Sequence, residues 1–156
     1  DILGKVCALV EPQLYSKNIQ IIKDIDELTI FGLENEFLQV VINILNNSKD
    51  EFERVSLEHK YIFISAKIIQ NSIKVTIKDN AGGIDEGIMD KVFEPYFTTK
   101  HQSQGTGIGL FMCKEIINKH MNGQLNISNQ SFEYKNKIYK GTLTRISLEN
   151  IVIEVQ

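Results

Sequence analysis

Apolar residues recur at helical spacing in three stretches of the chain. Residues 2–14 have this pattern, and Pro12 predicts that the first helix ends soon afterwards. Residues 34 to about 55 have the clearest amphipathic pattern, and residues 107 to about 121 predict a third helix that Gly123 would stop. The residues expected on the three buried faces are Ile2, Val6, Leu9 and Val10, then Phe37, Leu38, Val41, Ile42, Leu45 and Phe52, and finally Met112, Cys113, Ile116 and Ile117.

Segments rich in β-branched residues separate these helices and predict strands. The expected strands are residues 19–25, 28–31, 61–69, 72–78, 125–128, 132–139 and 142–148. The turn-like pair Gln70 and Asn71 makes residues 61–78 an antiparallel hairpin. Because the helices and strands interleave without a strict βαβ alternation, we predict an α+β fold. Its sheet is mixed and mostly antiparallel, with about five strands and three main helices.

Residues 81–106 lack sustained periodicity and contain four glycines and Pro95 within 26 residues. A loop of this length inside a compact domain is usually functional or disordered. We therefore treat this segment as a candidate part of a functional site.

The composition excludes several classes of protein. The 156 residues carry 17 Lys and Arg against 20 Asp and Glu, a net charge of −3, whereas nucleic-acid-binding surfaces are usually strongly basic. With 42% hydrophobic and 24% charged residues, the chain resembles an ordinary globular domain, and we predict one domain over residues 1–156. No nucleic-acid partner is expected.

No stretch has the roughly 18 apolar residues that cross a bilayer, and no secretory signal peptide begins the chain. Cys7 and Cys113 form no CxxC motif, which fits a reducing compartment and offers no zinc site. We predict a cytoplasmic chain without membrane contact. Because it starts at Asp1 rather than Met, we expect a fragment of a longer protein.

A polar stripe lies on the second predicted helix. Asn43, Asn46, Asn47 and Asp50 are spaced at i, i+3, i+4 and i+7, so they share one face. A solvated helix surface is one interpretation, but asparagine is a poor helix former, and three of them together indicate a site. A neutral carboxamide oxygen suits Mg²⁺ that is already surrounded by anionic phosphates.

Asp79 continues the apolar phase of the strand at residues 72–78, where Ile73, Val75 and Ile77 point to the same side. A carboxylate entering the buried side needs a hydrogen-bond donor. An Asx turn is the simpler alternative, and the amino group of a bound base is the functional one.

Two glycine-rich motifs follow, DNAGGI at residues 79–84 and GTGIGL at residues 105–110. Glycine permits close backbone approach, and a helix N-terminus presents free N–H groups, so the second motif suits phosphate. It lacks the GKS or GKT of a Walker A loop and does not follow a first strand as a Rossmann motif would.

Taken together, these segments resemble the ATP-binding catalytic domain of sensor histidine kinases. NILNNSKD at residues 43–50 resembles the N box, DNAGGI the G1 box, KVFEPYFTTK at residues 91–100 the F box, and GTGIGL the G2 box. Gly141 and Thr142 resemble the late glycine segment that closes the adenine pocket. The four boxes occur in the family's order, and the resemblance extends from about Ile2 to Leu148.

The resemblance implies a two-layer α/β sandwich, the Bergerat ATP-binding fold, with an ATP lid at residues 81–106. It implies that Asp79 recognises the adenine amino group, that Asn47 is the Mg²⁺ ligand, and that Asn43, Asn47 and Lys100 are the catalytic residues. It implies contacts with Mg-ATP from Asn43, Asn47, Asp50, Asp79, Gly83, Ile84, Phe93, Thr98, Thr99, Lys100, Gly105, Thr106, Gly107, Ile108, Gly109, Leu110 and Thr142.

Two positions depart from the family pattern. Ala81 stands where the G1 box often has glycine, and Asp50 stands where other members often have lysine. The charge on the β- and γ-phosphates must then be met elsewhere. Lys49 is one position off the polar stripe, so Lys100 in the lid is the better candidate.

The implied reaction transfers the γ-phosphoryl group of ATP to a histidine on an upstream dimerisation hairpin, and then to an aspartate of a response regulator. His59, His101 and His120 lack the acidic neighbour of the acceptor motif, so we interpret them as surface or capping residues. We therefore expect a monomeric fragment of a homodimeric parent, either cytoplasmic or the cytoplasmic part of a membrane-anchored sensor.

Two alternatives come from other classes of function. A serine/threonine protein kinase of the anti-sigma type shares this fold, and a nucleotide-binding module without kinase activity would retain the same loops. A chaperone- or topoisomerase-type ATPase is disfavoured, because Asn43 occupies the position of its catalytic glutamate.

Overall fold

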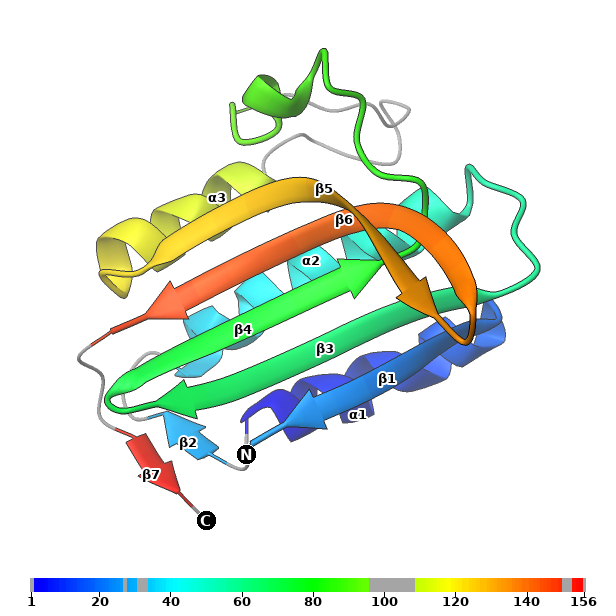
Figure 1. Ribbon diagram of the computed structural model, residues 1–156. Coiled ribbons are helices and arrows are strands. Elements are labelled where there is room, and N and C mark those ends of the chain that lie inside the picture. Colours follow the sequence, from blue (N-terminus) through cyan, green and yellow to red (C-terminus); the bar gives the residue numbers. More distant parts are fainter. Residues whose placement is uncertain (1, 27, 31–33, 96–108, 150–152, 156) are drawn as a thin grey trace.

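A five-stranded mixed sheet forms the framework of the molecule (Figure 1). The structure is a computed structural model that describes residues 2–26, 28–30, 34–95, 109–149 and 153–155. The strand order is β1 (Ile19–Ile25), β3 (Lys60–Ile69), β4 (Ser72–Asp79), β6 (Lys137–Leu148) and β5 (Gln124–Tyr134). β1 and β3 are parallel, and the other neighbours are antiparallel. A separate antiparallel pair joins β2 (Leu28–Ile30) to β7 (Ile153–Val155).

The helices cover one face of this sheet and leave the other face open (Figure 1). They are α1 (Ile2–Ser16), α2 (Glu34–Phe52) and α3 (Gly109–Glu115), which continues as a π-helical turn at Ile116–His120. A short 3-10 helix at Met89–Lys91 lies in the lid. Two layers with a mixed, mostly antiparallel sheet confirm the predicted α+β sandwich fold.

Period-2 alternation in the strands and period-3.6 alternation in α2 build a single core between the layers. In β4, Ile73, Val75 and Ile77 are buried toward the helices, and Asp79 follows in the same phase. The buried residues of α2 are Phe37, Val40, Val41, Ile44, Leu45, Ser48 and Phe52. Leu38 and Ile42, predicted for this face, are only partly buried at its edge. The apolar stripe of α2 is thus rotated slightly from the one predicted.

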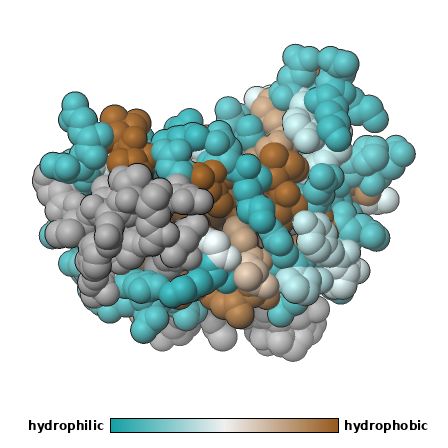
Figure 2. Space-filling view, turned by 90° about the horizontal axis from the view of Figure 1, so that it is seen from below, coloured by the Kyte–Doolittle hydropathy of each residue, from teal (hydrophilic) through white to brown (hydrophobic). Residues whose placement is uncertain are grey.

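Helix ends and some buried positions differ from the prediction. α1 extends to Ser16, α2 already ends at Phe52, and the described part of the third helix begins at Gly109. Leu9 is 63% exposed and Met112 is 42% exposed, so predicting burial for them was wrong. Isolated exposed apolar residues are common because polar atoms cannot cover a whole protein surface. Figure 2 shows this mixture, with apolar side chains interspersed among polar ones.

The prediction of one strand over residues 132–139 was also wrong. β5 continues to Tyr134, the chain turns at Lys135 and Asn136, and β6 begins at Lys137. Both turn residues have positive φ, 49° and 63°, as a type I′ hairpin turn requires. The turn lacks the Asn-Gly or Asp-Gly pair that usually marks this geometry, so the local sequence read as a continuous strand.

The tip of the β5–β6 hairpin curves over the open face of the sheet (Figure 1) and builds a small aromatic cluster there. Its members are Tyr61, Phe63, Phe132, Tyr134 and Tyr139. The ring centroids of Tyr61 and Tyr134 are 4.9 Å apart, those of Phe63 and Phe132 are 5.4 Å apart, and both pairs meet edge to face. Such pairs add stability beyond their buried area.

Lys78 completes this cluster, because its Nζ lies 4.1 Å from the centroid of the Phe132 ring and 5.0 Å from that of Phe63. Burial lowers the pKa of Lys78. The cluster therefore holds the hairpin against β3, with which the hairpin does not pair in the sheet.

In the described part of the chain, no helix is both long and apolar enough to cross a membrane.

Tyr61→Ala tests whether the aromatic cluster stabilises the fold. Tyr61 is 5% exposed, so its removal leaves a cavity beneath the hairpin. We expect the free energy of unfolding to fall by about 3–5 kcal/mol, measured by urea titration. Ile138→Ala, in the same hairpin but at a side chain 78% exposed, is the control and should change it by about 0.5 kcal/mol or less. Equal effects of the two substitutions would contradict this role.

Candidate nucleotide-binding site

The carboxylate of Asp79 joins three elements at the end of β4. Its Oδ1 accepts hydrogen bonds from the backbone N–H groups of Ala81 (3.0 Å) and Thr142 (3.2 Å). Its Oδ2 accepts one from the hydroxyl of Ser48 (2.8 Å). The side chain is thereby fixed between α2, β4 and β6, and the residue is only 4% exposed.

Both interpretations of Asp79 made from the sequence remain compatible with this geometry. The bond from Ala81 N is an Asx turn, the simpler alternative. A carboxylate has about four acceptor positions, however, and the hydrogen bonds from the described residues occupy three of them, two on Oδ1 and one on Oδ2. An amino group of a bound base can therefore still donate to it, so the residues present fit an adenine ligand.

Burial raises the pKa of Asp79, and the hydrogen bonds from Ala81, Ser48 and Thr142 oppose this rise. Burial makes the charged form costly because it removes hydration from the carboxylate. The surrounding hydrogen-bond donors reduce this cost. Keeping this carboxylate buried therefore costs stability at pH values where it is charged, and it gives a directional acceptor.

Two glycines allow close backbone contacts next to Asp79. A Cβ on Gly141 would lie 1.6 Å from the carbonyl oxygen of Asp79, so only glycine lets β6 approach the end of β4 this closely. Gly82, with φ of +96°, donates its N–H to the carbonyl of Lys140 (3.0 Å). The G1 motif and the late glycine segment are thus in direct backbone contact.

The sequence patterns did not identify two neighbouring polar residues, Asn80 and Ser48. Asn80 is 2% exposed, accepts a hydrogen bond from the backbone N–H of Tyr61 (2.8 Å) and donates one to the carbonyl of His59 (2.9 Å). Ser48 bonds Asp79, as described above. In Ser48, the available signal was a hydroxyl in the buried phase of an amphipathic helix, next to the polar stripe.

The polar stripe of α2 runs beside the start of α3. Asn43, Asn46, Asn47 and Asp50 are all half-buried, which favours a site over a fully solvated helix surface. A Cβ on Gly109 would lie 4.0 Å from Oδ1 of Asn43, so the G2 motif ends against this stripe.

Cys113 lies one turn further along α3. Burial raises the pKa of its thiol to about 11, which keeps the thiol unreactive.

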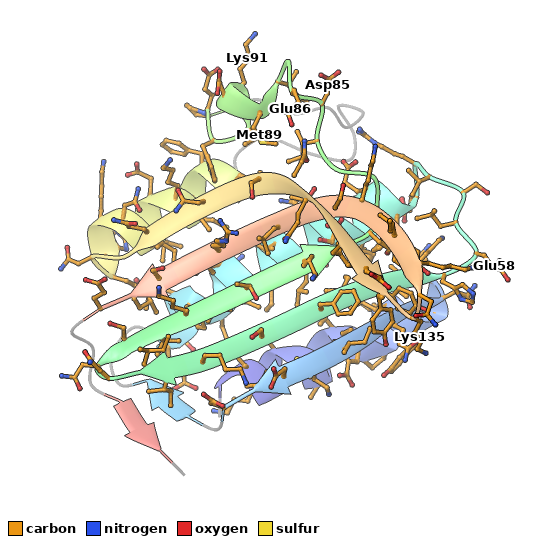
Figure 3. All side chains as sticks on the ribbon, viewed as in Figure 1. Glu58, Asp85, Glu86, Met89, Lys91 and Lys135 are labelled. Atoms are coloured by element: carbon orange, nitrogen blue, oxygen red, sulfur yellow. The ribbon has the colours of Figure 1, made fainter. Side chains whose placement is uncertain are left out.

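The chain leaves the sheet at the end of β4 and enters the segment predicted to form the lid. Figure 3 shows Asp85, Glu86, Met89 and Lys91 together on this segment, with Lys91 extending away from the sheet. Further along, Phe93 packs against the core, and Nζ of Lys114 on α3 lies 4.4 Å from its ring centroid. Phe93 is therefore tied to α3 in this structure.

The structure brings Asp79, Gly83, Ile84 and Thr142 together at one end of the sheet, while Asn43 and Gly109 face each other between α2 and α3. Leu110 is half-buried in the first turn of α3. The remaining predicted contacts lie outside the described residues, and they are Thr98, Thr99, Lys100, Gly105, Thr106, Gly107 and Ile108.

The family model of the histidine kinase-, DNA gyrase B-, and HSP90-like ATPases matches residues 32–150, and the chain belongs to this family. Within it, the chain is an ATP-binding catalytic domain of the sensor histidine kinase type, which confirms the resemblance seen in the motifs. The catalytic domain of histidine kinase ThkA, in a nucleotide-free form, superposes with a TM-score of 0.75 at 25% identity. The match covers 95% of this chain and 90% of that one.

Two curated relatives are a two-component sensor and a sporulation kinase. Two-component sensor PprA of Pseudomonas aeruginosa is 32% identical over 111 residues, covering 66% of this chain and 11% of PprA. Sporulation kinase A of Bacillus subtilis is 31% identical over 121 residues, covering 76% of this chain and 19% of that kinase. The chain therefore spans less than a fifth of the length of either relative.

Asp79→Asn should change how stability depends on pH. Because the pKa of Asp79 is raised in the folded state, its favourable contribution is present below the unfolded-state pKa and is lost as pH rises through the folded-state pKa. Asparagine stays neutral. The variant should therefore gain stability relative to the wild type as pH rises above about 4.

Urea unfolding at a series of pH values from acid to neutral measures this difference. Asp90→Asn removes an exposed carboxylate and is the control for the loss of one negative charge. A pH dependence for Asp79→Asn no greater than that for the control would show that burial of the Asp79 carboxylate does not govern its titration.

Proposed function

We propose that the chain binds Mg-ATP and donates the γ-phosphoryl group to a histidine on an upstream helical hairpin of the same protein. The phosphoryl group then passes to an aspartate of a response regulator in two-component signal transduction. The observation that carries this proposal is the buried Asp79, fixed by three hydrogen bonds beside glycine loops, in a domain of the sensor histidine kinase type.

In this proposal, Asp79 selects adenine by accepting from its amino group. The carboxylate is already oriented by Ser48 and by the backbone of Ala81 and Thr142, so little reorganisation accompanies binding. Gly83, Ile84 and Thr142 contribute backbone and side-chain contacts around the base. Gly141 supports them by keeping β6 against the end of β4.

Asn43 and Asn47 lie one helical turn apart on α2, and we assign Asn47 as the Mg²⁺ ligand. A neutral amide fits an ion that takes its other ligands from phosphate and water. Bound Mg²⁺ neutralises the charge of the β- and γ-phosphates. Asp50 cannot supply a positive charge at the end of this stripe, so Lys100 of the lid is assigned to the phosphates.

Phosphoryl transfer depends mainly on positioning and charge neutralisation, and it needs little covalent chemistry from the protein. Asn43, Asn47 and Lys100 perform these tasks in the proposed site. The G2 motif, from Gly105 to Leu110, leads into α3, whose N-terminus suits phosphate.

The acceptor histidine is assigned to the hairpin because the described histidines have other contacts. His120 lies at the end of the π-helical turn, and its Nδ1 is 3.2 Å from the carboxylate of Glu36. His59 is exposed and stacks on Tyr61, with ring centroids 6.1 Å apart. Both are surface residues, and His101 lies outside the described residues. Because none of the three has the acidic neighbour of the acceptor motif, we expect that the chain alone does not accept its own phosphoryl group.

Asp79→Asn should weaken binding of a non-hydrolysable ATP analogue. Loss of a hydrogen bond to a charged acceptor costs about 1–3 kcal/mol, or roughly 5- to 150-fold in Kd by titration calorimetry. The control is Asp24→Asn, an exposed carboxylate at the far side of the sheet on β1. Unchanged affinity in Asp79→Asn would remove this residue from the nucleotide site.

Transfer of label from γ-labelled ATP in the presence of Mg²⁺ tests the proposed reaction. The full protein should form an acid-labile, alkali-stable phosphohistidine, whereas residues 1–156 alone should bind ATP without becoming labelled. Stable phosphohistidine on the isolated chain would contradict the assigned acceptor. Acid-stable label on a partner protein would replace this proposal with a serine/threonine kinase, and binding without transfer would indicate a nucleotide-binding module.

A further inference from the structure

The side chain of Asn129 on β5 pairs with both backbone groups of Ile84. Its Oδ1 accepts a hydrogen bond from the N–H of Ile84 (2.7 Å), and its Nδ2 donates one to the carbonyl of the same residue (2.6 Å). A carboxamide offers a donor and an acceptor on one planar group, so it imitates the edge of a β-strand. No local sequence pattern predicts this contact, because 45 positions separate the two residues.

The backbone before Ile84 is shaped to permit this contact. A Cβ on Gly83 would lie 2.7 Å from Oδ1 of Asn129, and Gly83 has φ of +88°, which disfavours other residues. The second glycine of the G1 motif is therefore required by the approach of the Asn129 side chain, as well as by any approach of a ligand.

Nδ2 of Asn129 also donates to Oε1 of Glu86 (2.9 Å), which lies further along the lid. The asparagine therefore contacts the lid at two positions, Ile84 and Glu86, and Figure 3 shows Glu86 on the segment that rises from the sheet. These contacts hold the point at which the lid leaves the G1 motif.

The position of Asn129 in the sheet connects these contacts to the adenine pocket. Asn129 lies directly opposite Thr142 in the β5–β6 ladder, and the N–H of Thr142 donates to Asp79. One cross-strand pair therefore contacts both Asp79, at the start of the G1 motif, and Ile84, at its end.

We propose that Asn129 is a positioning residue for nucleotide binding, which fixes the start of the lid relative to Asp79. The inference rests on the proposed function and extends it to a residue outside the recognised motifs. Asn129 acts through Ile84 and Glu86. A free lid start would have to be ordered each time a nucleotide binds, so the preformed contact favours binding.

Asn129→Asp is the main test because the two side chains have the same shape. The carboxylate can still accept from the N–H of Ile84, but it cannot donate, and it faces the carbonyl of Ile84 and the carboxylate of Glu86. We expect an increase of about tenfold in the Kd of a non-hydrolysable ATP analogue. We also expect trypsin to cut after Lys91 about tenfold faster without nucleotide, as local opening becomes easier.

The matched control is Asn126→Asp, which adds the same charge on the same strand. Asn126 is exposed and lies on the opposite face of the sheet from Asn129. It should leave the Kd and the cleavage rate unchanged. Asn129→Ser is the alternative variant if Asn129→Asp lowers the melting temperature substantially. It removes the hydrogen bond to Glu86 without adding charge, so the Kd and the cleavage rate should change in the same direction but by less.

Rescue by a second substitution distinguishes positioning from general destabilisation. In the Asn129→Asp chain, Glu86→Gln restores a donor opposite the new carboxylate, so Kd and cleavage rate should return part of the way toward wild type. In the wild-type chain, Glu86→Gln should have little effect, which gives a measurable coupling between the two positions. A merely structural role for Asn129 predicts no such rescue.

The inference is overturned if Asn129→Asp behaves as Asn126→Asp in both assays, or if Glu86→Gln gives no rescue. Failure of the nucleotide binding on which the inference rests has a different signature, because the wild-type chain would then not bind the ATP analogue at all. Failure of phosphoryl transfer alone is detected in the labelling experiment and leaves both of these assays unaffected. Cleavage in the absence of nucleotide would still decide whether Asn129 holds the lid start.

Discussion

The rest of the site depends on the buried carboxylate of Asp79. Three donors from α2, from the G1 turn and from β6 converge on it, so the helix layer and the sheet are joined at a single side chain. Burial still raises its pKa, which means that these donors do not fully compensate for the lost hydration. The molecule therefore gives up stability at neutral pH to keep a charged acceptor at a fixed place.

Most of the fold could be predicted from periodicity. Alternation in β4 and the apolar stripe of α2 are strong because each element buries one face against the other layer. The errors arose where burial or direction depends on distant contacts. Leu9 and Met112 have the right spacing but face solvent, and the turn at Lys135 and Asn136 is held in positive φ without glycine because the aromatic residues around it pack on β3.

The site was predictable only where it follows sequence motifs. Asp79, Gly83 and Thr142 stand within recognisable boxes, and the structure places them side by side. Ser48 and Asn129 act on residues 31 and 45 positions away, so the local pattern places Ser48 in the buried phase of α2 but reveals the partner of neither residue. Their side-chain types are unremarkable in an amphipathic helix and in a strand, and their roles depend on the register of the sheet and the rotation of α2.

The β5–β6 hairpin connects these parts of the molecule. At its tip, Phe132 and Tyr134 pack on the open face of the sheet, while nearer its middle Asn129 and Thr142 reach the two ends of the G1 motif. The strand between tip and middle is short, and one continuous β5–β6 ladder joins the aromatic cluster to Asn129. The same hairpin therefore contributes both to the packing on the face opposite the helices and to the contacts of Asn129 and Thr142 at the candidate site.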